Sequence, residues 1–219
     1  DKAGDAVFKL RLRPTSNVAA YRALVADLCL DDQSQDFTAE TLASSEEDDP
    51  SVTQESLRDQ WSKMTDTHQF FGMLKKLKIG RARAIRIVGE DYAWKLADGA
   101  VADMLRAAAD AGTAIMCFVA NRGMVQIHGG PISNVQPMVP WINIMDPSFH
   151  LHLRQDHIAE AWAVRKPTVD GTVTSFEAFN AKGEMIIQFF GKRKEGGGER
   201  ADWRAIVEAL PRAQTSVAA

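Results

Sequence analysis

The strongest constraint on the fold is a change of hydrophobic period near Thr113. Before this residue the period is helical, in the runs ESLRDQWSKM, MTDTHQFFGMLKKLK, ARAIRIVGEDYAWKL and ADGAVADMLRAAADA. After it come shorter runs of strand character, separated by glycine or polar turns: AIMCFVA, MVQIHG, FHLHLR, IAEAWAVRKPT, TVTSFEAFN and EMIIQFFGKRK. Helices followed by successive antiparallel strands predict an α+β fold, with helices packed on a large antiparallel β-sheet.

The two ends of the chain share one pattern. Residues 4–13 and 183–193 each read as a glycine turn and a strand that ends in basic residues, and a helix with an aromatic-Arg-Ala-aliphatic-Val pattern follows each of them. Chance similarity between two short segments is the alternative. If the repeat is real, residues 1–30 are the tail of a preceding copy, a strand plus a helix. Residues 57–212 are then a complete copy, with a disordered tail at 213–219.

Charge and composition argue against several classes of protein. Residues 31–56 hold nine acidic residues and no lysine or arginine, which is typical of a solvated linker. The whole chain has 26 basic and 29 acidic residues, so it is not built mainly to bind nucleic acid or an anionic membrane. No run approaches the roughly 20 apolar residues of a membrane helix, and we expect no membrane insertion. Cys29 and Cys117 lie in apolar runs, which predicts buried free thiols in the cytoplasm.

The run MTDTHQFFGMLKKLK places a glycine inside a helix. Thr65 is the expected N-cap, Phe70 and Leu74 belong to the apolar stripe, and His68 lies off that stripe with Gly72 one turn further on. A glycine in a helix interior costs about 1 kcal/mol relative to alanine. One reason to keep it is to clear the surface beside an imidazole that could bind iron. The alternative is a partly buried structural histidine, with the glycine at a close helix contact.

Two further groups of polar residues suggest binding sites. Six cations without an acid among them follow the histidine, and they form either a solvated helix face or a site for carboxylates, phosphates or nucleic acid: Lys75, Lys76, Lys78, Arg81, Arg83 and Arg86. Three histidines, His150, His152 and His157, are either exposed strand residues or zinc ligands, and no HExxH motif accompanies them. No nucleophile or Walker motif is present, so no catalytic residue is assigned.

Several long segments resemble one protein family. These are MTDTHQFFGMLKK, NRGMVQIHGGPI, PWINIMDPSFHLHLRQDHIAEAWAVRKPT and EMIIQFFGKRK. They resemble the second, C-terminal half of the HemS/ChuS/PhuS/HmuS family of bacterial cytoplasmic haemin-binding and haem-degrading proteins, and residues 4–28 resemble the end of the first half. The resemblance implies one half of a duplicated α+β fold plus a remnant of the other half, with haem b as the cofactor.

The resemblance also implies the site residues. His68 matches the proximal iron ligand and so the metal site, and Arg81 and Lys166 match contacts to the haem propionates. Gln188 and Arg193 match polar contacts along the last strand. At Phe190 some members carry tyrosine, so one hydroxyl contact is expected to be absent here. The family's distal arginine comes from the first half.

The implied function is haem binding in bacterial haem uptake and iron acquisition, with haem degradation or haem delivery by the full-length protein. Haem-degrading activity is not expected of this chain alone. The alternatives are a haem carrier without turnover and, as a lesser one, a nucleic-acid or phosphate-binding module. Implied partners besides haem are a haem oxygenase, a reductase or the inner-membrane haem transporter. An apolar surface that normally meets the other half predicts a homodimer.

Overall fold

The computed structural model describes residues 3–33, 38–40, 48–194 and 196–214. The chain forms two compact units, one of residues 1–45 with 121–124 and one of residues 46–120 with 125–219. No helix in the described part of the chain is both long and apolar enough to cross a membrane.

The described part of the first unit contains one helix, α1 (Val18–Leu28), and α1 buries none of its residues. Asn17 caps it, since its side-chain oxygen accepts a hydrogen bond of 2.9 Å from the backbone of Ala20. The strand expected before this helix is absent from described residues 3–16, because no strand of the structure pairs with that segment. Cys29 is a free but exposed thiol, so the prediction that it is buried is wrong.

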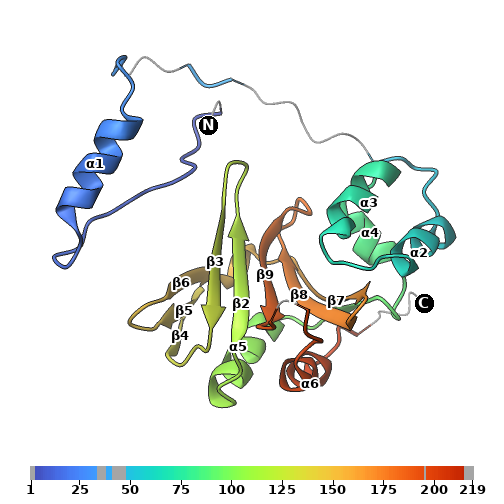
Figure 1. Ribbon diagram of the computed structural model, residues 1–219. Coiled ribbons are helices and arrows are strands. Elements are labelled where there is room, and N and C mark those ends of the chain that lie inside the picture. Colours follow the sequence, from blue (N-terminus) through green and yellow to red (C-terminus); the bar gives the residue numbers. More distant parts are fainter. Residues whose placement is uncertain (1–2, 34–37, 41–47, 195, 215–219) are drawn as a thin grey trace. The chain divides into compact units, whose positions relative to one another are not determined.

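The second unit contains two antiparallel sheets (Figure 1). The large sheet has the strand order β1-β7-β8-β9-β2-β3, and its strands are β1 (Ala93–Leu96), β2 (Ile115–Ala120), β3 (Val125–Gly130), β7 (Glu160–Thr168), β8 (Gly171–Phe179) and β9 (Met185–Gly191). The small sheet consists of β4 (Val135–Met138), β5 (Trp141–Met145) and β6 (His150–Arg154), which the short 3₁₀ helix η1 (Gln155–His157) follows. This arrangement confirms the predicted α+β fold.

Helices cover parts of both faces of the large sheet. On one face α5 (Ala100–Asp110) and α6 (Ala201–Ala209) share a core with strand residues such as Phe176 and Phe189, and they lie below the sheet in Figure 1. On the other face a second core joins Trp162 and Val164 of β7 to three short helices: α2 (Gln54–Ser62), α3 (Gln69–Leu77) and α4 (Arg81–Ile87). These three helices cluster near β1 and β7, so part of this face is left without a helix.

One further element prediction is wrong, and two strands were not predicted. The run ARAIRIVGEDYAWKL is not one helix, because α4 ends at Ile87 and Gly89 adopts a φ of +98°, a conformation that favours glycine. Its last residues form β1, which pairs with β7. The sequence also gave no indication of β4 and β5, since Pro137 and Pro140 interrupt the strand pattern there.

The predicted acidic linker is shorter than expected. α2 begins inside it, and Thr53 and Ser56 form a capping box at the start of that helix. Val52 is buried, and the carbonyl of Asp49 accepts a hydrogen bond of 2.6 Å from Arg83. Residues 48–56 therefore belong to the second unit, whereas predicted linker residues 34–37 and 41–47 lie outside the described residues.

The end of the chain seals one edge of the large sheet. The backbone N–H of Ala97 donates to the carbonyl of Pro211 at 2.8 Å, and that of Ala213 donates to the carbonyl of Lys95 at 3.0 Å. The guanidinium of Arg212 also lies 5.0 Å from the ring centre of Trp94. This pairing satisfies the exposed backbone of β1. The expected tail therefore begins later than residue 213, and residues 215–219 lie outside the described part.

Candidate functional site

The turn before α3 places His68 at the surface. α3 begins at Gln69, so the predicted N-cap at Thr65 is wrong. Asp66 directs the turn instead, because its carboxylate accepts a hydrogen bond of 2.7 Å from the backbone N–H of His68. The Thr65 backbone donates to the side chain of Gln69 at 2.8 Å, which closes the same turn.

The imidazole of His68 is oriented and open. Its Nδ1 lies 2.6 Å from Oδ1 of Asp66, and its side chain is 92% exposed. Hydrogen bonds from the His68 backbone and side chain lower the pKa of Asp66, so this carboxylate is ionised and can only accept. In the neutral ring the proton therefore lies on Nδ1, which leaves the lone pair of Nε2 free to bind a metal. The alternative of a partly buried structural histidine is wrong.

The surface beside this imidazole is also open. A Cβ atom added at Gly72 would meet nothing within 4 Å, apart from its own helix and chain neighbours, so this glycine is not at a close helix contact. Phe71, three residues after His68, is 74% exposed. The helix surface one turn beyond the histidine is therefore open, and this is compatible with the functional interpretation of the glycine.

Five of the six residues that the family resemblance implied line one pocket of about 270 Å³. His68 comes from the turn before α3, Arg81 from the start of α4, Lys166 from β7, and Gln188 and Phe190 from β9. The remaining lining residues are Thr67, Phe70, Phe71 and Phe118. The volume of this pocket lies just below the 300–1,000 Å³ of typical ligand sites.

The register of the large sheet brings the strand residues together. Phe118 of β2 pairs with Gln188 of β9, and Gln188 pairs with Glu177 of β8. Directly paired residues point to the same face of a sheet, here the face that α2, α3 and α4 cover only in part. The rings of Phe118 and Phe190 meet edge to face, with centres 5.6 Å apart, and give the pocket an aromatic floor.

Sequence reasoning missed Glu177, which lies at the centre of the polar part of this site. Its side chain is fully buried, and it binds Arg81 through two hydrogen bonds of 2.7 and 2.8 Å. It also accepts from Lys166 Nζ at 2.7 Å, from Gln188 Nε2 at 2.8 Å and from Ser175 Oγ at 2.7 Å. In TVTSFEAFN a single glutamate reads as a residue on a solvated strand face, because alternation does not reveal that helices cover that face.

Burial and charge compete at this cluster. Burial lowers the pKa of Lys166 to about 8, against the attraction of Glu177. Burial alone would raise the pKa of Glu177, but the two neighbouring cations outweigh this effect and hold the pKa below its usual value. At neutral pH Arg81, Lys166 and Glu177 are therefore all ionised, which leaves one positive charge in excess.

The other predicted cations are arranged differently. Arg193 does not line the pocket, and it donates to the carbonyl of Gly197 at 3.1 Å. In the predicted anion site, Arg83 binds the Asp49 carbonyl, and Arg86 forms an ion pair with Glu160 at 2.9 Å. Together with the Arg81 pair, these contacts engage half of the six cations, so a nucleic-acid surface along this run is not supported.

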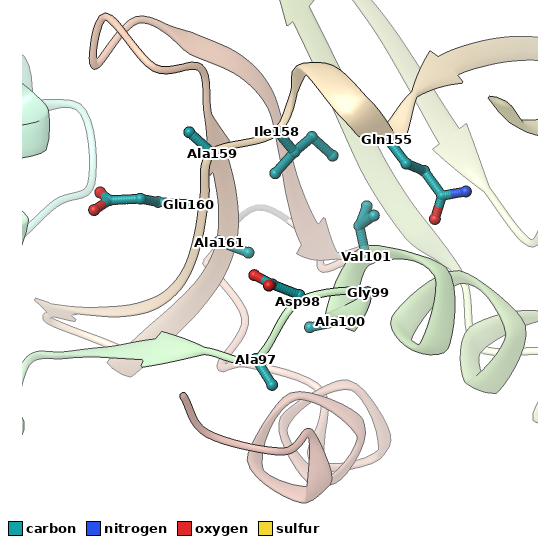
Figure 2. Close-up of a pocket in the computed structure, with 10 residues that line it drawn as sticks. All are labelled: Ala97, Asp98, Gly99, Ala100, Val101, Gln155, Ile158, Ala159, Glu160 and Ala161. Carbon is teal, nitrogen blue, oxygen red and sulfur yellow. The ribbon is translucent and has the colours of Figure 1, made fainter. Parts of the chain in front are cut away.

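Two other candidate sites, the pocket beside α5 and the three histidines near β6, lack suitable groups. Figure 2 shows a pocket of about 360 Å³ that the residues before and at the start of α5 form with the segment between η1 and β7. Its described lining carries the carboxylates of Asp98 and Glu160 but neither a cation nor an imidazole, so it cannot neutralise an anionic ligand. The alternative of a zinc site at His150, His152 and His157 is not supported, since no three potential ligands are grouped anywhere in the described residues.

Comparisons with known proteins agree with the resemblance. Residues 78–210 match the family model described as the haemin-degrading HemS.ChuX domain. The hemin transport protein HemS of Yersinia enterocolitica is 40% identical over 210 residues, which are 96% of this chain and 61% of HemS.

Two solved structures have the same fold. The heme-degrading enzyme ChuS of Escherichia coli O157:H7 is 39% identical and superposes with a TM-score of 0.84, over 96% of this chain and 61% of ChuS. For apo-PhuS, a heme-binding protein from Pseudomonas aeruginosa, the identity is 39% and the TM-score 0.82, over 92% of this chain and 60% of PhuS. The chain thus spans about three fifths of the length of these relatives, and it belongs to the HemS/ChuX family of haemin-degrading domains.

Proposed function

We propose that this chain binds haem b in the pocket beside α3, with Nε2 of His68 as the proximal ligand of the iron. The observation that carries the proposal is that a free imidazole nitrogen and two cations line one pocket with an aromatic floor. An imidazole suits iron, apolar rings suit a macrocycle, and guanidinium and ammonium groups suit its carboxylates. When bound, the haem supplies redox-active iron.

Each residue has a separate part in this proposal. Asp66 keeps the proton on Nδ1 of His68, and Gly72 leaves the helix surface clear. Arg81 and Lys166 neutralise the propionates. Arg193 acts from outside the pocket through its charge, which also contributes to the lowered pKa of Asp66.

The proposed biological role is haem handling in the bacterial cytoplasm, in uptake and iron acquisition. It is supported by the names of relatives that transport, bind or degrade haem. These relatives are longer than this chain, so we propose haem binding for the chain itself and degradation or delivery for a full-length protein, with an oxygenase, a reductase or a transporter as partner.

A titration with haemin tests the binding proposal. We expect saturation at one haemin per chain and a Soret band sharpened and shifted from that of free haemin, because the pocket offers one free imidazole nitrogen. The readout is absorbance between about 350 and 700 nm, which covers the porphyrin spectrum. A linear rise without saturation, or an unchanged Soret band, would contradict the proposal.

We further propose that two copies of the chain associate through the uncovered part of the large sheet. Ile127 and Val125 of β3 are each 50% exposed, and Ile127 pairs with Phe118 of the pocket. An apolar face continuous with an open pocket is suited to a second copy that completes the site.

Light scattering on a sizing column should give a dimer for the wild type and a monomer for Ile127→Lys. Val169→Lys, at a residue 79% exposed outside this face, should stay dimeric; a wild-type monomer at high concentration would refute association.

A further inference from the structure

The buried cluster around Glu177 contains more donors than acceptors. Oε1 of Glu177 accepts from Arg81 Nη2, Lys166 Nζ, Ser175 Oγ and Gln188 Nε2, while Oε2 accepts from Arg81 Nε. An ionised carboxylate offers about four lone-pair sites, two on each oxygen. Five donors therefore compete for Glu177, and four of them converge on one atom.

Donor capacity is left over at the pocket wall. An ammonium group has three N–H bonds, and Lys166 uses them on two oxygens, of Glu177 and of Ser175 at 2.8 Å. A guanidinium has five, and Arg81 directs two of its nitrogens to Glu177. Both side chains line the pocket, whereas Glu177 does not. Spare donors and an excess positive charge at a site this buried call for an acceptor from outside the chain.

We infer that Glu177 is the positioning residue of the haem site: it holds Arg81, Lys166 and Gln188 at the pocket wall, and the one positive charge left over selects a porphyrin with a free carboxylate. This inference rests on the proposed function. Glu177 acts only through its neighbours and does not touch the ligand. Its two oxygens join β7, β8, β9 and the start of α4, so one carboxylate sets the geometry of three contacts.

Removing the charge of Glu177 changes the state of Lys166 as well as its position. The charged groups that face Lys166 are Glu177 from β8 and Arg81 from α4, and His68 lines the same pocket from the start of α3. The pKa of Lys166 is about 8 while Glu177 attracts its proton, and it falls further without that attraction. In Glu177→Gln the lysine therefore loses its charge at a lower pH than in the wild type.

Haemin affinity measured from pH 6 to 10 tests this role, with haemin as the probe. The wild type should bind more weakly above about pH 8. In Glu177→Gln this decline should begin at least about one pH unit lower, and affinity at pH 7 should fall about 10-fold to 100-fold, as for other residues that orient a ligand-binding group. The matched control Glu55→Gln removes an exposed carboxylate of α2 and should behave as the wild type. A Glu177→Gln variant with the wild-type profile would overturn the inference, even if its binding were uniformly weaker.

The dimethyl ester of haemin separates this inference from the proposed function. The wild type should prefer haemin over the ester about 10-fold to 100-fold, since the ester loses charge-assisted hydrogen bonds. Lys166→Gln should bind haemin with no decline near pH 8, and this measurement replaces the first one if Glu177→Gln does not fold. No binding of either porphyrin refutes the proposed function. Equal binding of both by the wild type refutes only the selection of a carboxylate by the Glu177 cluster.

Discussion

Replacing His68 by alanine is expected to lower haemin affinity by at least about 100-fold, because the loss of a residue that merely orients a metal ligand already costs 10-fold to 100-fold. The Soret band should move toward that of haemin held without an imidazole. Stability should be nearly unchanged, since the side chain is 92% exposed and its only hydrogen bond within the described residues is to the neighbouring Asp66. Absorption titrations of the two proteins measure the effect.

His157→Ala is the matched control for this experiment. His157 is an exposed histidine in η1, away from the pocket beside α3. Its removal should leave both the affinity and the spectrum as in the wild type. If His68→Ala binds haemin with the wild-type spectrum, the iron has another ligand and the assignment of His68 is wrong.

Replacing Lys166 by methionine is expected to stabilise the fold while it weakens haemin binding. The ammonium group is buried, and without it Glu177 keeps its two hydrogen bonds to Arg81, so no buried charge is left unpaired. Replacing a whole buried ion pair by apolar side chains of similar volume stabilises proteins by up to about 1–4 kcal/mol, and the same sign is expected here because Arg81 remains as the partner of Glu177. The rings of Phe70 and Phe190, whose centres lie 4.8 and 5.7 Å from Nζ, offer apolar contacts to the new side chain.

The pH dependence of this effect follows from the lowered pKa of Lys166. Below about pH 8 the lysine is protonated in both the folded and the unfolded chain, so the full cost of burying the charge opposes folding. Between about pH 8 and the ordinary lysine value of 10.5, only the unfolded chain keeps the proton, and the wild type gains stability as the pH rises. The advantage of Lys166→Met should therefore shrink over this range and vanish above it.

Urea unfolding at pH 7 and pH 10 measures both predictions for Lys166. Lys182→Met, at an exposed lysine in the turn before β9, controls for the general loss of a cation. A Lys166→Met variant that is less stable than the wild type at pH 7 would show that the ammonium group holds the cluster together. A more stable Lys166→Met variant would show that the lysine serves to bind the ligand rather than to stabilise the fold, whereas Glu177 serves to position its neighbours.

The sequence predicted the elements with strong periodicity and missed those whose pattern is interrupted. β7, β8 and β9 lie where their alternation places them. The segment AWKL reads as a continuation of the helical run before it, because a single glycine, Gly89, is a weak stop signal and only pairing with β7 makes the segment a strand. The start of α3 was placed too early at Thr65, since the carboxylate of Asp66 makes a turn that a preference for threonine at helix starts does not reveal.

The candidate site was predictable only in part, and for a physical reason. The resemblance supplied His68, Arg81, Lys166, Gln188 and Phe190 as separate contacts, and the fold places them around one pocket. The resemblance does not give the reason why these side chains all face the same pocket. That reason is Glu177, whose environment depends on the start of α4 placing Arg81 beside it and on the register of β7 and β9, and a local sequence pattern does not reveal such long-range geometry.

The last described residues of the chain have a practical consequence for anyone who shortens it. Pro211, Arg212 and Ala213 act as a substitute neighbour along β1. In a protein shortened before Pro211, β1 would be an edge strand with unpaired backbone groups. Trp94 would also lose one of its two contacts with arginine. We expect such a shortened protein to precipitate before it loses affinity for any ligand.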